Sequence, residues 1–303
     1  MENPLIAVSQ QLADAVERAG KSVVAVSARP RLASSGVVWR DGIVVTADHT
    51  IRRTEEITVS LPDGRTLAAA LAGRDSATDL AVLKVEGAGL PVPEFATGPL
   101  AVGSLVLAVG RSPETGANAS LGVISSLAGP WRTWRGGRVD RFVRLDLSLY
   151  PGSSGSAIID AQGRALGLAT TGLSRSAPLA IPAATVERVL AELLTRGHIA
   201  RGYLGLGLQP VVLPEHLSSR LNLPERGGVI VLSVEPAGPA ERAGVVLGDV
   251  LVALRGQPVR DTDDVQAFLE TEFVGQAVPA RILRAGVLTE FPITIGERPR
   301  REE

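Results

Sequence analysis

Short apolar runs separated by turn residues dominate the first two thirds of the chain. Between Ser22 and about Ile181 these runs include SVVAVSA, IVVTA, LAVLKV and LVLAVG. Asp41-Gly42 and Asp63-Gly64 fit the tight turns that connect β-strands. A series of short strands with turn signals between them predicts an all-β barrel or sandwich.

Helical spacing of apolar residues occurs on both sides of this β-rich region. Within residues 5–19, Leu5, Leu12 and Val16 recur at roughly helical intervals and predict a short amphipathic helix. Residues 182–196 predict a second helix that begins with Pro182 and is ended by Gly197.

The pattern changes again after residue 201, where strand-like and helix-like runs mix over about 100 residues, the size of a small domain. Helix-like runs fall at 214–221 and 262–272. Strand-like runs fall at 204–208, 228–234, 249–254, 278–284 and 287–295. We therefore expect an N-terminal helix over 1–20, a β-rich domain over 21–197, a second domain over 202–296 and a flexible tail over 297–303.

Composition excludes several classes of function. The 303 residues carry 31 Lys and Arg against 32 Asp and Glu, a net charge of −1, which argues against a basic nucleic-acid groove. Cysteine is absent, so thiol chemistry and cysteine metal sites are excluded, and with 3 histidines a polyhistidine site is not favoured. We expect no metal and no cofactor.

The sequence shows neither a membrane-spanning segment nor a targeting signal. No run approaches the roughly 20 apolar residues that a spanning helix needs. The first residues carry acids early and lack the basic-then-apolar order of a signal peptide. As written, the chain is expected to be cytoplasmic with no membrane partner; the alternative is an extracytoplasmic protein whose start was trimmed.

Three segments carry residues that could do chemistry together. His49 follows the strand-like run IVVTA, Asp79 precedes LAVLKV, and Ser154 lies in the turn PGSSGS. Each alone fits a structural role, since Asp is a common turn former and small residues connect strands. Together, histidine, aspartate and a serine within Gly-x-Ser-Gly follow the chain order of the chymotrypsin-type triad. Imidazole activates a serine hydroxyl, a buried carboxylate orients the imidazole, and glycines let N–H groups reach an oxyanion.

These segments resemble the HtrA/Deg family of serine proteases over roughly residues 8–295. IVVTADHT, TDLAVLKV and PGSSGSAII resemble the family's histidine, aspartate and serine segments, and LVLAVGRSPETGANASLGVISSL resembles the stretch between the last two. The resemblance implies a mainly β fold: a chymotrypsin/trypsin-like double β-barrel followed by a small α+β PDZ domain. It also implies an ATP-independent serine endopeptidase that cleaves unfolded or flexible polypeptides.

Carried over residue by residue, the resemblance makes His49 the general base, Asp79 its orienting partner and Ser154 the nucleophile. The N–H groups of Gly152 and Ser154, helped by Ser153, would form the oxyanion hole. The family usually has Asn where this chain has Ser153 and Gly-Pro where it has Ser156-Ala157, and a side chain at Ser156 could crowd the turn. The alternative is therefore a catalytically impaired peptide-binding or chaperone-like scaffold that retains the protease fold.

The specificity pocket is predicted from its position relative to the nucleophile. Ser148, six residues before Ser154, would lie at the pocket base, and without an acid there selection for Arg or Lys is not expected. The loop TGLSRSAPLAIP would form the other wall through Leu173, Leu179 and Ala180. We expect cleavage after small or medium aliphatic residues.

The segment RGYLGL resembles the carboxylate-binding loop of the family's PDZ domains, which regulates the protease by binding peptides. C-terminal peptides would bind there by β-addition. The predicted contacts are Tyr203, Leu204, Gly205 and Leu206, with Val265 on the opposite helix either lining the groove or packing in the core.

Two further features concern partners. Trp131 and Trp134 lie among arginines in GPWRTWRGGRVDR, a pattern seen in single-strand nucleic-acid binding, but a loop beside the active site packed by its tryptophans is the better interpretation. In related proteases this region resembles a sensor loop.

Family members commonly form trimers through aromatic residues near the start of the protease domain, and this chain has none before Trp39. The resemblance thus implies a homotrimer, and the absence of these aromatic residues argues against it.

Overall fold

The chain divides into two compact units, Met1–Ile199 and Ala200–Glu303. The computed structural model describes residues 3–87, 89–269 and 273–298. The elements of the first unit are α1 (Pro4–Gly20), β1 (Val23–Ser27), β2 (Ser34–Arg40), β3 (Ile43–Ala47), the 3₁₀ turn η1 (Asp48–Thr50), β4 (Ile57–Ser60), β5 (Thr66–Asp75), β6 (Leu80–Lys84), β7 (Leu105–Ser112), β8 (Gly116–Ala128), β9 (Trp131–Arg132), β10 (Arg138–Val139), β11 (Phe142–Asp146), β12 (Ala157–Asp160), β13 (Ala165–Thr170), β14 (Leu179–Pro182) and α2 (Ala183–Arg196).

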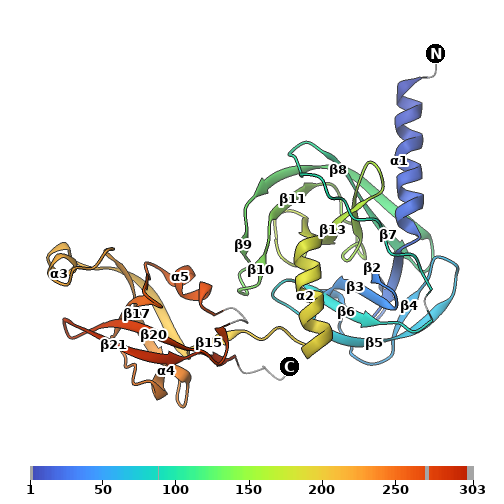
Figure 1. Cartoon of the computed structure of the whole chain (residues 1–303). Helices are drawn as coiled ribbons and strands as arrows, with labels where there is room; N and C mark the ends of the chain where they lie inside the picture. The colour runs from blue at the N-terminus through green and yellow to red at the C-terminus, as the bar shows by residue number, and fades with distance from the viewer. Residues whose placement is uncertain (1–2, 88, 270–272, 299–303) are drawn as a thin grey trace. The chain divides into compact units, whose positions relative to one another are not determined.

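Two closed antiparallel barrels make up most of the first unit (Figure 1). The first runs β1-β2-β3-β6-β5-β4 and the second β11-β14-β13-β12-β7-β8, with β9 and β10 forming a separate hairpin. Closure pairs every strand and leaves no sheet edge exposed. The predicted double β-barrel is confirmed.

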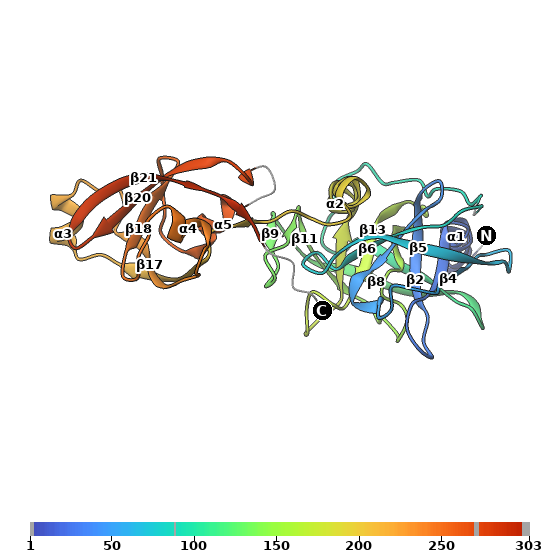
Figure 2. The ribbon, with the colours of Figure 1, turned by 90° about the horizontal axis from the view of Figure 1, so that it is seen from below.

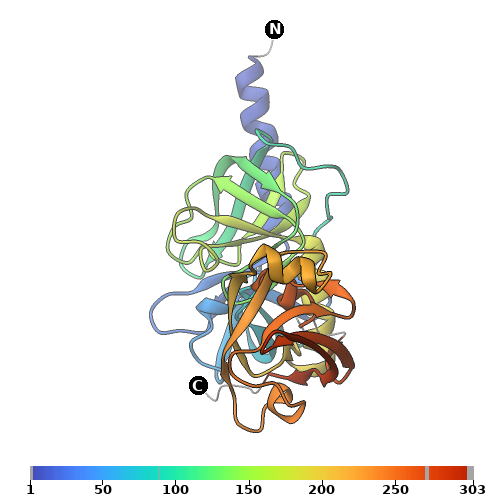
Figure 3. The ribbon, with the colours of Figure 1, turned by 90° about the vertical axis from the view of Figure 1, so that its left-hand side faces the viewer.

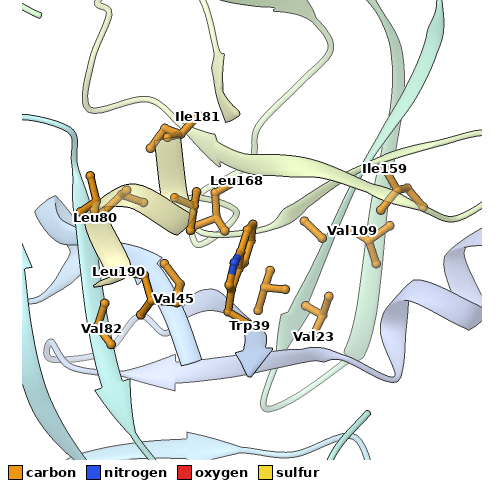
Figure 4. Packing of buried hydrophobic residues seen from close by; sticks show 14 of the residues in the cluster. Val23, Trp39, Val45, Leu80, Val82, Val109, Ile159, Leu168, Ile181 and Leu190 are labelled. Carbon is orange, nitrogen blue, oxygen red and sulfur yellow. The ribbon is translucent and has the colours of Figure 1, made fainter. Parts of the chain in front are cut away.

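Strand alternation gives each barrel its own core and places a third, larger core between the barrels. On β1, Val24 points into the first barrel, whereas Val23 joins the shared cluster that contains Trp39. The second barrel has an interior of its own built around residues such as Ile124 and Ile158. Figure 4 shows Trp39 at the centre of the shared cluster, with residues of both barrels and Leu190 of α2 around it. Because side chains alternate along a strand, one strand can serve two cores.

Both predicted helices of the first unit form, with ends that their sequences explain. Asn3 caps α1 by accepting a hydrogen bond from Leu5 N at 3.0 Å. Gly197 ends α2 in the left-handed region, at φ 73°, where a residue without Cβ is favoured. The first turns of α1 extend beyond the strands, as Figures 1 and 3 show. Among the described residues, no helix combines the length and the apolar character needed to cross a bilayer.

The second unit is a small sheet with short helices. Its elements are β15 (Gly202–Tyr203), β16 (Leu206–Val212), α3 (Glu215–Arg220), β17 (Gly227–Val234), α4 (Pro239–Arg242), β18 (Val250–Leu254), β19 (Gln257–Pro258), α5 (Thr262–Ala267), β20 (Ala277–Arg284), β21 (Val287–Thr294) and β22 (Gly296–Glu297). The main sheet has the order β16-β17-β18-β20-β21, and β19 pairs with β18. Figure 2 shows β20 and β21 side by side. The mixed α+β character predicted for this region is confirmed.

Two expectations near the C-terminus end differently in the structure. The helix predicted over 262–272 ends at Ala267, and residues 270–272 lie outside the described residues. Glu297, the first residue of the predicted tail, pairs with Gly202 in the sheet. Residues 299–303 of that tail also lie outside the described part.

Candidate active site

His49 and Asp79 are brought together by two neighbouring strands of the first barrel. His49 lies in η1 directly after β3, and Asp79 directly precedes β6; the register pairs Ala47 with Leu80. His49 Nδ1 lies 2.8 Å from Asp79 Oδ2 and 3.0 Å from Oδ1. The backbone N–H of His49 also donates to Asp79 Oδ1 at 2.8 Å. The carboxylate thus holds the imidazole and the backbone that carries it.

The turn before Asp79 is built to present this carboxylate. Asp79 is 3% exposed and has φ 57°, a left-handed conformation that Asp tolerates better than most residues. The Asp75 carboxylate accepts hydrogen bonds from Thr78 Oγ1 at 2.6 Å and Ala77 N at 3.2 Å. Asp48 N donates to the Asp79 carbonyl at 3.2 Å. Asp75 therefore orders the turn, a role that the sequence interpretation missed because it depends on the turn's three-dimensional path.

An ion pair lies directly beside His49. Asp48, whose side chain is buried, pairs with Arg74 of β5 through Nε and Oδ1 at 2.5 Å. Removing one partner from a pair of this kind leaves an uncompensated buried charge. The pair anchors the segment that carries His49.

The second barrel supplies two further residues to the pair. Thr170 Oγ1 donates to Asp79 Oδ2 and accepts from Gly172 N at 2.8 Å. A methyl group at Gly172 would lie 2.5 Å from Asp79 Oδ2 and 2.7 Å from His49 Nδ1. Gly172 has no positive φ, so this glycine is required for space and not for backbone conformation. The sequence segment TTG carried no signal for either contact, because both cross between barrels.

Ser154 is presented by a tight turn in the second barrel. Ser153 N donates to the Tyr150 carbonyl at 2.9 Å, and Gly152 has φ 92°, the geometry of a turn with Pro then Gly at its centre. Within the described chain, the N–H groups of Gly152 and Ser154 have no hydrogen-bond partner. The N–H of Ser153 is occupied, so the structure removes it from the predicted oxyanion donors and leaves Gly152 and Ser154.

Ser35 of the first barrel supports this turn from behind. Its hydroxyl donates to the Gly152 carbonyl at 3.2 Å, and its N–H donates to the Ser154 carbonyl at 3.2 Å. Gly155 has φ 87°, and a Cβ there would overlap the Ser35 carbonyl oxygen. The Ser35 carbonyl therefore explains the glycine at position 155, and the positive φ of Gly152 explains the glycine before the two serines.

The Ser154 hydroxyl faces a different partner from the one that the triad chemistry needs. Its hydrogen bond is with Thr171 Oγ1 at 3.2 Å. Among the described residues, none joins it to His49. The structure therefore brings His49 and Asp79 together and leaves the Ser154 hydroxyl on Thr171.

The Ser156 side chain does not crowd the substrate side of the turn. It is 1% exposed, and its hydroxyl is buried without a hydrogen-bond partner in the described chain. A methyl group at Gly110 would lie 2.6 Å from this hydroxyl, which points into the protein between β7 and the serine turn. The substitution thus places a polar group in the interior instead of obstructing the site.

The predicted specificity residues separate in the structure. Ser148 is exposed, while Leu173, Leu179 and Ala180 are buried. Leu173 and Leu179 belong to the cluster shared by the barrels, but Ala180 points into the interior of the second barrel. Neighbouring residues of a strand face opposite sides, so Leu179 and Ala180 cannot both line one pocket.

The predicted peptide-binding loop of the second unit has an exposed strand edge. Leu206 begins β16, which is the edge strand of the sheet, and Gly205 has φ 74°. Tyr203 donates its hydroxyl hydrogen to Glu235, and this bond raises the pKa of the Tyr203 phenol above its ordinary value. Leu204 and Val265 are buried in the core of the unit, Val265 at 2% exposure. The Val265 side chain therefore packs in the core, the second of the two roles considered for it.

Comparison with known proteins defines the class to which this fold and site belong. A model described as trypsin-like peptidase domain matches residues 34–168, and a model described as PDZ domain matches residues 230–277. The chain therefore combines a trypsin-like peptidase fold with a C-terminal PDZ domain.

Similar proteins define the family. Serine endoprotease DegS of Haemophilus influenzae is 30% identical over 278 residues, which cover 88% of this chain and 78% of the relative. A probable periplasmic DegP-like serine endoprotease of Brucella suis is 33% identical over 280 residues, 89% of this chain and 54% of the relative. The chain thus spans about half the length of that relative.

Solved structures of serine proteases have the same fold as this chain. The serine endoprotease from Yersinia pestis superposes with TM-score 0.78 at 30% identity, covering 95% of this chain and 98% of that one. The HtrA-type protease AlgW with a decapeptide superposes with TM-score 0.77 at 27% identity, covering 96% and 99%. The chain belongs to the HtrA/Deg family of serine endoproteases.

Proposed function

We propose that this chain is a serine endopeptidase in which Ser154 is the nucleophile, His49 the general base and Asp79 its orienting partner. The observation that carries the proposal is the contact of His49 Nδ1 with both oxygens of the buried Asp79 carboxylate, at 3.0 and 2.8 Å. Such a carboxylate fixes one tautomer of the imidazole and stabilises its protonated form.

The reaction follows from these contacts. With Nδ1–H donating to Asp79, His49 Nε2 is the free acceptor, and the Ser154 hydroxyl leaves Thr171 by rotation about its Cα–Cβ bond to reach it. Ser154 Oγ then attacks the peptide carbonyl as its proton passes to Nε2. The N–H groups of Gly152 and Ser154 bind the oxyanion, an effect on the order of 3 kcal/mol per donor.

Two proton transfers complete the cycle. When the C–N bond breaks, the imidazolium gives its proton to the departing amine and leaves an acyl ester on Ser154. A water molecule then attacks this ester with His49 again as base, which releases the acid product and restores the serine.

Substrate class and regulation rest on the family and on the second unit. We propose unfolded or flexible polypeptides as substrates, with cleavage after small or medium aliphatic residues. The free edge of β16 supports binding of C-terminal peptides by β-addition and regulation of the protease by that binding. A homotrimer stays a proposal, to be checked by light scattering.

The cellular compartment is likewise a proposal. The relatives named periplasmic favour an extracytoplasmic protein over the cytoplasmic expectation. Fractionation of the source cells, with the protein followed by antibody, decides between these two.

A second candidate function is a peptide-binding scaffold that retains the fold but does not cleave. The observation that favours it is the hydrogen bond of the Ser154 hydroxyl with Thr171 instead of His49. Hydrogen bonds at catalytic groups are often loose before substrate binds, so the endopeptidase is the better candidate.

Casein digestion and fluorophosphonate labelling, followed by intact mass, test the endopeptidase. We expect digestion and a single adduct in the wild-type protein, and a loss in Ser154→Ala of about 10⁶-fold in kcat, as for other serine proteases without their nucleophile. Ser9→Ala, an exposed serine of α1, is the matched control and keeps both signals. No digestion and no adduct, even with a C-terminal peptide added, favour the scaffold.

A further inference from the structure

A pocket lies beside the proposed nucleophile and is lined largely by the loop after β13. It has a volume of about 290 Å³. Its lining residues are Trp134, Thr171, Gly172, Leu173, Ser174 and Arg175. Thr171 is the residue whose hydroxyl meets Ser154, so the near end of the pocket adjoins the nucleophile.

Trp134, which is 75% exposed, also lines this pocket. Its hairpin, β9–β10, is nevertheless well anchored: Thr133 Oγ1 donates to the Ala77 carbonyl at 2.7 Å, and Trp131 packs edge-on against Phe142 at 5.5 Å between ring centroids. A large aromatic side chain left exposed on an anchored hairpin costs little entropy when it binds a partner, because its position is already set.

Two arginines, one lining the pocket and one stacked on Trp134, give this region a positive charge. The Arg135 guanidinium lies 4.5 Å from the centre of the Trp134 ring. Arg175 is exposed, and no hydrogen bond or ion pair of its side chain occurs within the described residues. This positive charge disfavours Lys and Arg side chains, while the exposed indole of Trp134 favours an apolar one.

We propose that this pocket is a second substrate subsite that accepts an uncharged aromatic side chain located two to four residues before the cleaved bond. The proposal rests on the proposed function for the direction of the peptide: the loop after β13, which was predicted to form one wall of the primary specificity pocket, also lines this pocket, so its occupant is placed on the same side of that bond. Aromatic stacking on Trp134 supplies the selectivity, and Thr171 links the pocket to Ser154.

Peptide binding to the Ser154→Ala protein tests the subsite without requiring catalysis. The probes are C-terminally amidated peptides, which lack the carboxylate for the PDZ loop, with Val before the bond and Phe, Ala or Lys two, three or four residues before it. An aromatic pair is worth about 0.5–1.5 kcal/mol, so the Phe peptide is expected to bind about two- to tenfold more tightly than the Ala peptide at one of these positions. The Lys peptide is expected to bind most weakly.

Variants assign this preference to Trp134. Adding Trp134→Ala should reduce the Phe-to-Ala ratio to about one and leave the Ala peptide unchanged, whereas Trp134→Phe should retain most of the preference. Leu121→Ala, an exposed apolar residue of β8 outside the pocket, is the matched control. Arg175→Gln should improve binding of the Lys peptide by up to about fivefold, the range of an exposed charge pair.

The outcomes separate the subsite from the proposed function. Equal affinities for Phe and Ala peptides at all three positions, a Phe preference that survives Trp134→Ala, or a loss for every peptide alike would overturn the subsite. If the wild-type protein cleaves none of the peptides while Ser154→Ala prefers Phe, the pocket stands as a binding site for an aromatic side chain and the endopeptidase fails. If the wild-type protein cleaves Phe and Ala peptides equally well, the endopeptidase stands and the subsite fails.

Discussion

The two halves of the proposed active site come from different barrels and are held in different ways. In the first barrel, His49 and Asp79 are joined through the imidazole and through the His49 backbone N–H, and Asp79 is buried. In the second barrel, a turn with left-handed glycines positions Ser154, and among the described residues its hydroxyl has one partner, Thr171 at 3.2 Å. The His49 and Asp79 side chains are thus held by several hydrogen bonds, whereas the Ser154 side chain is held by one.

Desolvation explains this difference. A buried carboxylate that loses a hydrogen-bond donor is left with an unsatisfied charge, and this raises the free energy of the folded state. Each hydrogen bond to the Asp79 carboxylate therefore stabilises the fold. A hydroxyl exchanges one neutral partner for another at a net cost of about 0.5–1.5 kcal/mol or less. The proposed acid–base pair is thus held in place by charge, while the Ser154 hydroxyl is held only by a neutral hydrogen bond.

The strongest way to break the charged half is Asp79→Asn. Asn keeps the shape of the side chain and tolerates the left-handed backbone at this position, but it allows the wrong imidazole tautomer, so kcat should fall by about 10⁴-fold. The measurement is the rate of peptide cleavage, with the melting temperature as control for folding. A loss of less than tenfold in a folded variant would remove Asp79 from the mechanism.

Gly172→Ala tests the space around the same pair. The added methyl group would lie within 2.7 Å of both His49 Nδ1 and Asp79 Oδ2, so the pair must move apart. Displacements of about 1 Å cost on the order of 10² in rate, and we expect that loss in kcat/KM. Gly129→Ala, a glycine with open space around it, is the matched control and should retain full activity.

Two adjacent threonines sharpen the comparison between the halves. Thr170→Val removes a donor to the buried carboxylate and should lower kcat/KM by about tenfold or more, since hydrogen bonds to charged groups are worth about 1.5–3 kcal/mol. Thr171→Val removes the resting partner of Ser154 and should raise the rate of fluorophosphonate labelling by about two- to fivefold, because it releases a neutral hydrogen bond. If both variants slow labelling equally, the two halves do not differ as described.

Ser156→Ala should have the smallest effect on activity and a measurable one on stability. The Ser156 hydroxyl is buried without a partner in the described chain, a cost of about 1–3 kcal/mol that alanine removes. We expect the free energy of unfolding to rise by about 1 kcal/mol with cleavage unchanged. Urea denaturation measures it, with Ser9→Ala as the exposed control; a decrease in stability would show that the hydroxyl is hydrogen-bonded through water.

Local patterns predicted most of the fold. Apolar runs with turn residues between them predicted a barrel or a sandwich, the family resemblance implied the double barrel, and Pro182 and Gly197 marked α2 to within one residue. Local sequence patterns did not predict features that depend on contacts between segments distant in the sequence. The helix predicted over 262–272 ends at Ala267, and only the packing of Val265 in the core of its unit shows which role that residue has.

The sequence by itself determined the β-rich first region, the smaller mixed second region and the candidates His49, Asp79 and Ser154, because these follow from the period of short strands and from motif order; the double barrel and the PDZ domain followed from the family resemblance of those motifs. Only the tertiary structure decided which contacts those residues make. Thr170, Gly172 and Ser35 reach the site across the junction of the two barrels, and no local pattern encodes such distances. The hydrogen bond of the Ser154 hydroxyl is likewise decided by the tertiary structure, because the fold of the second barrel places Thr171 Oγ1 at 3.2 Å from it.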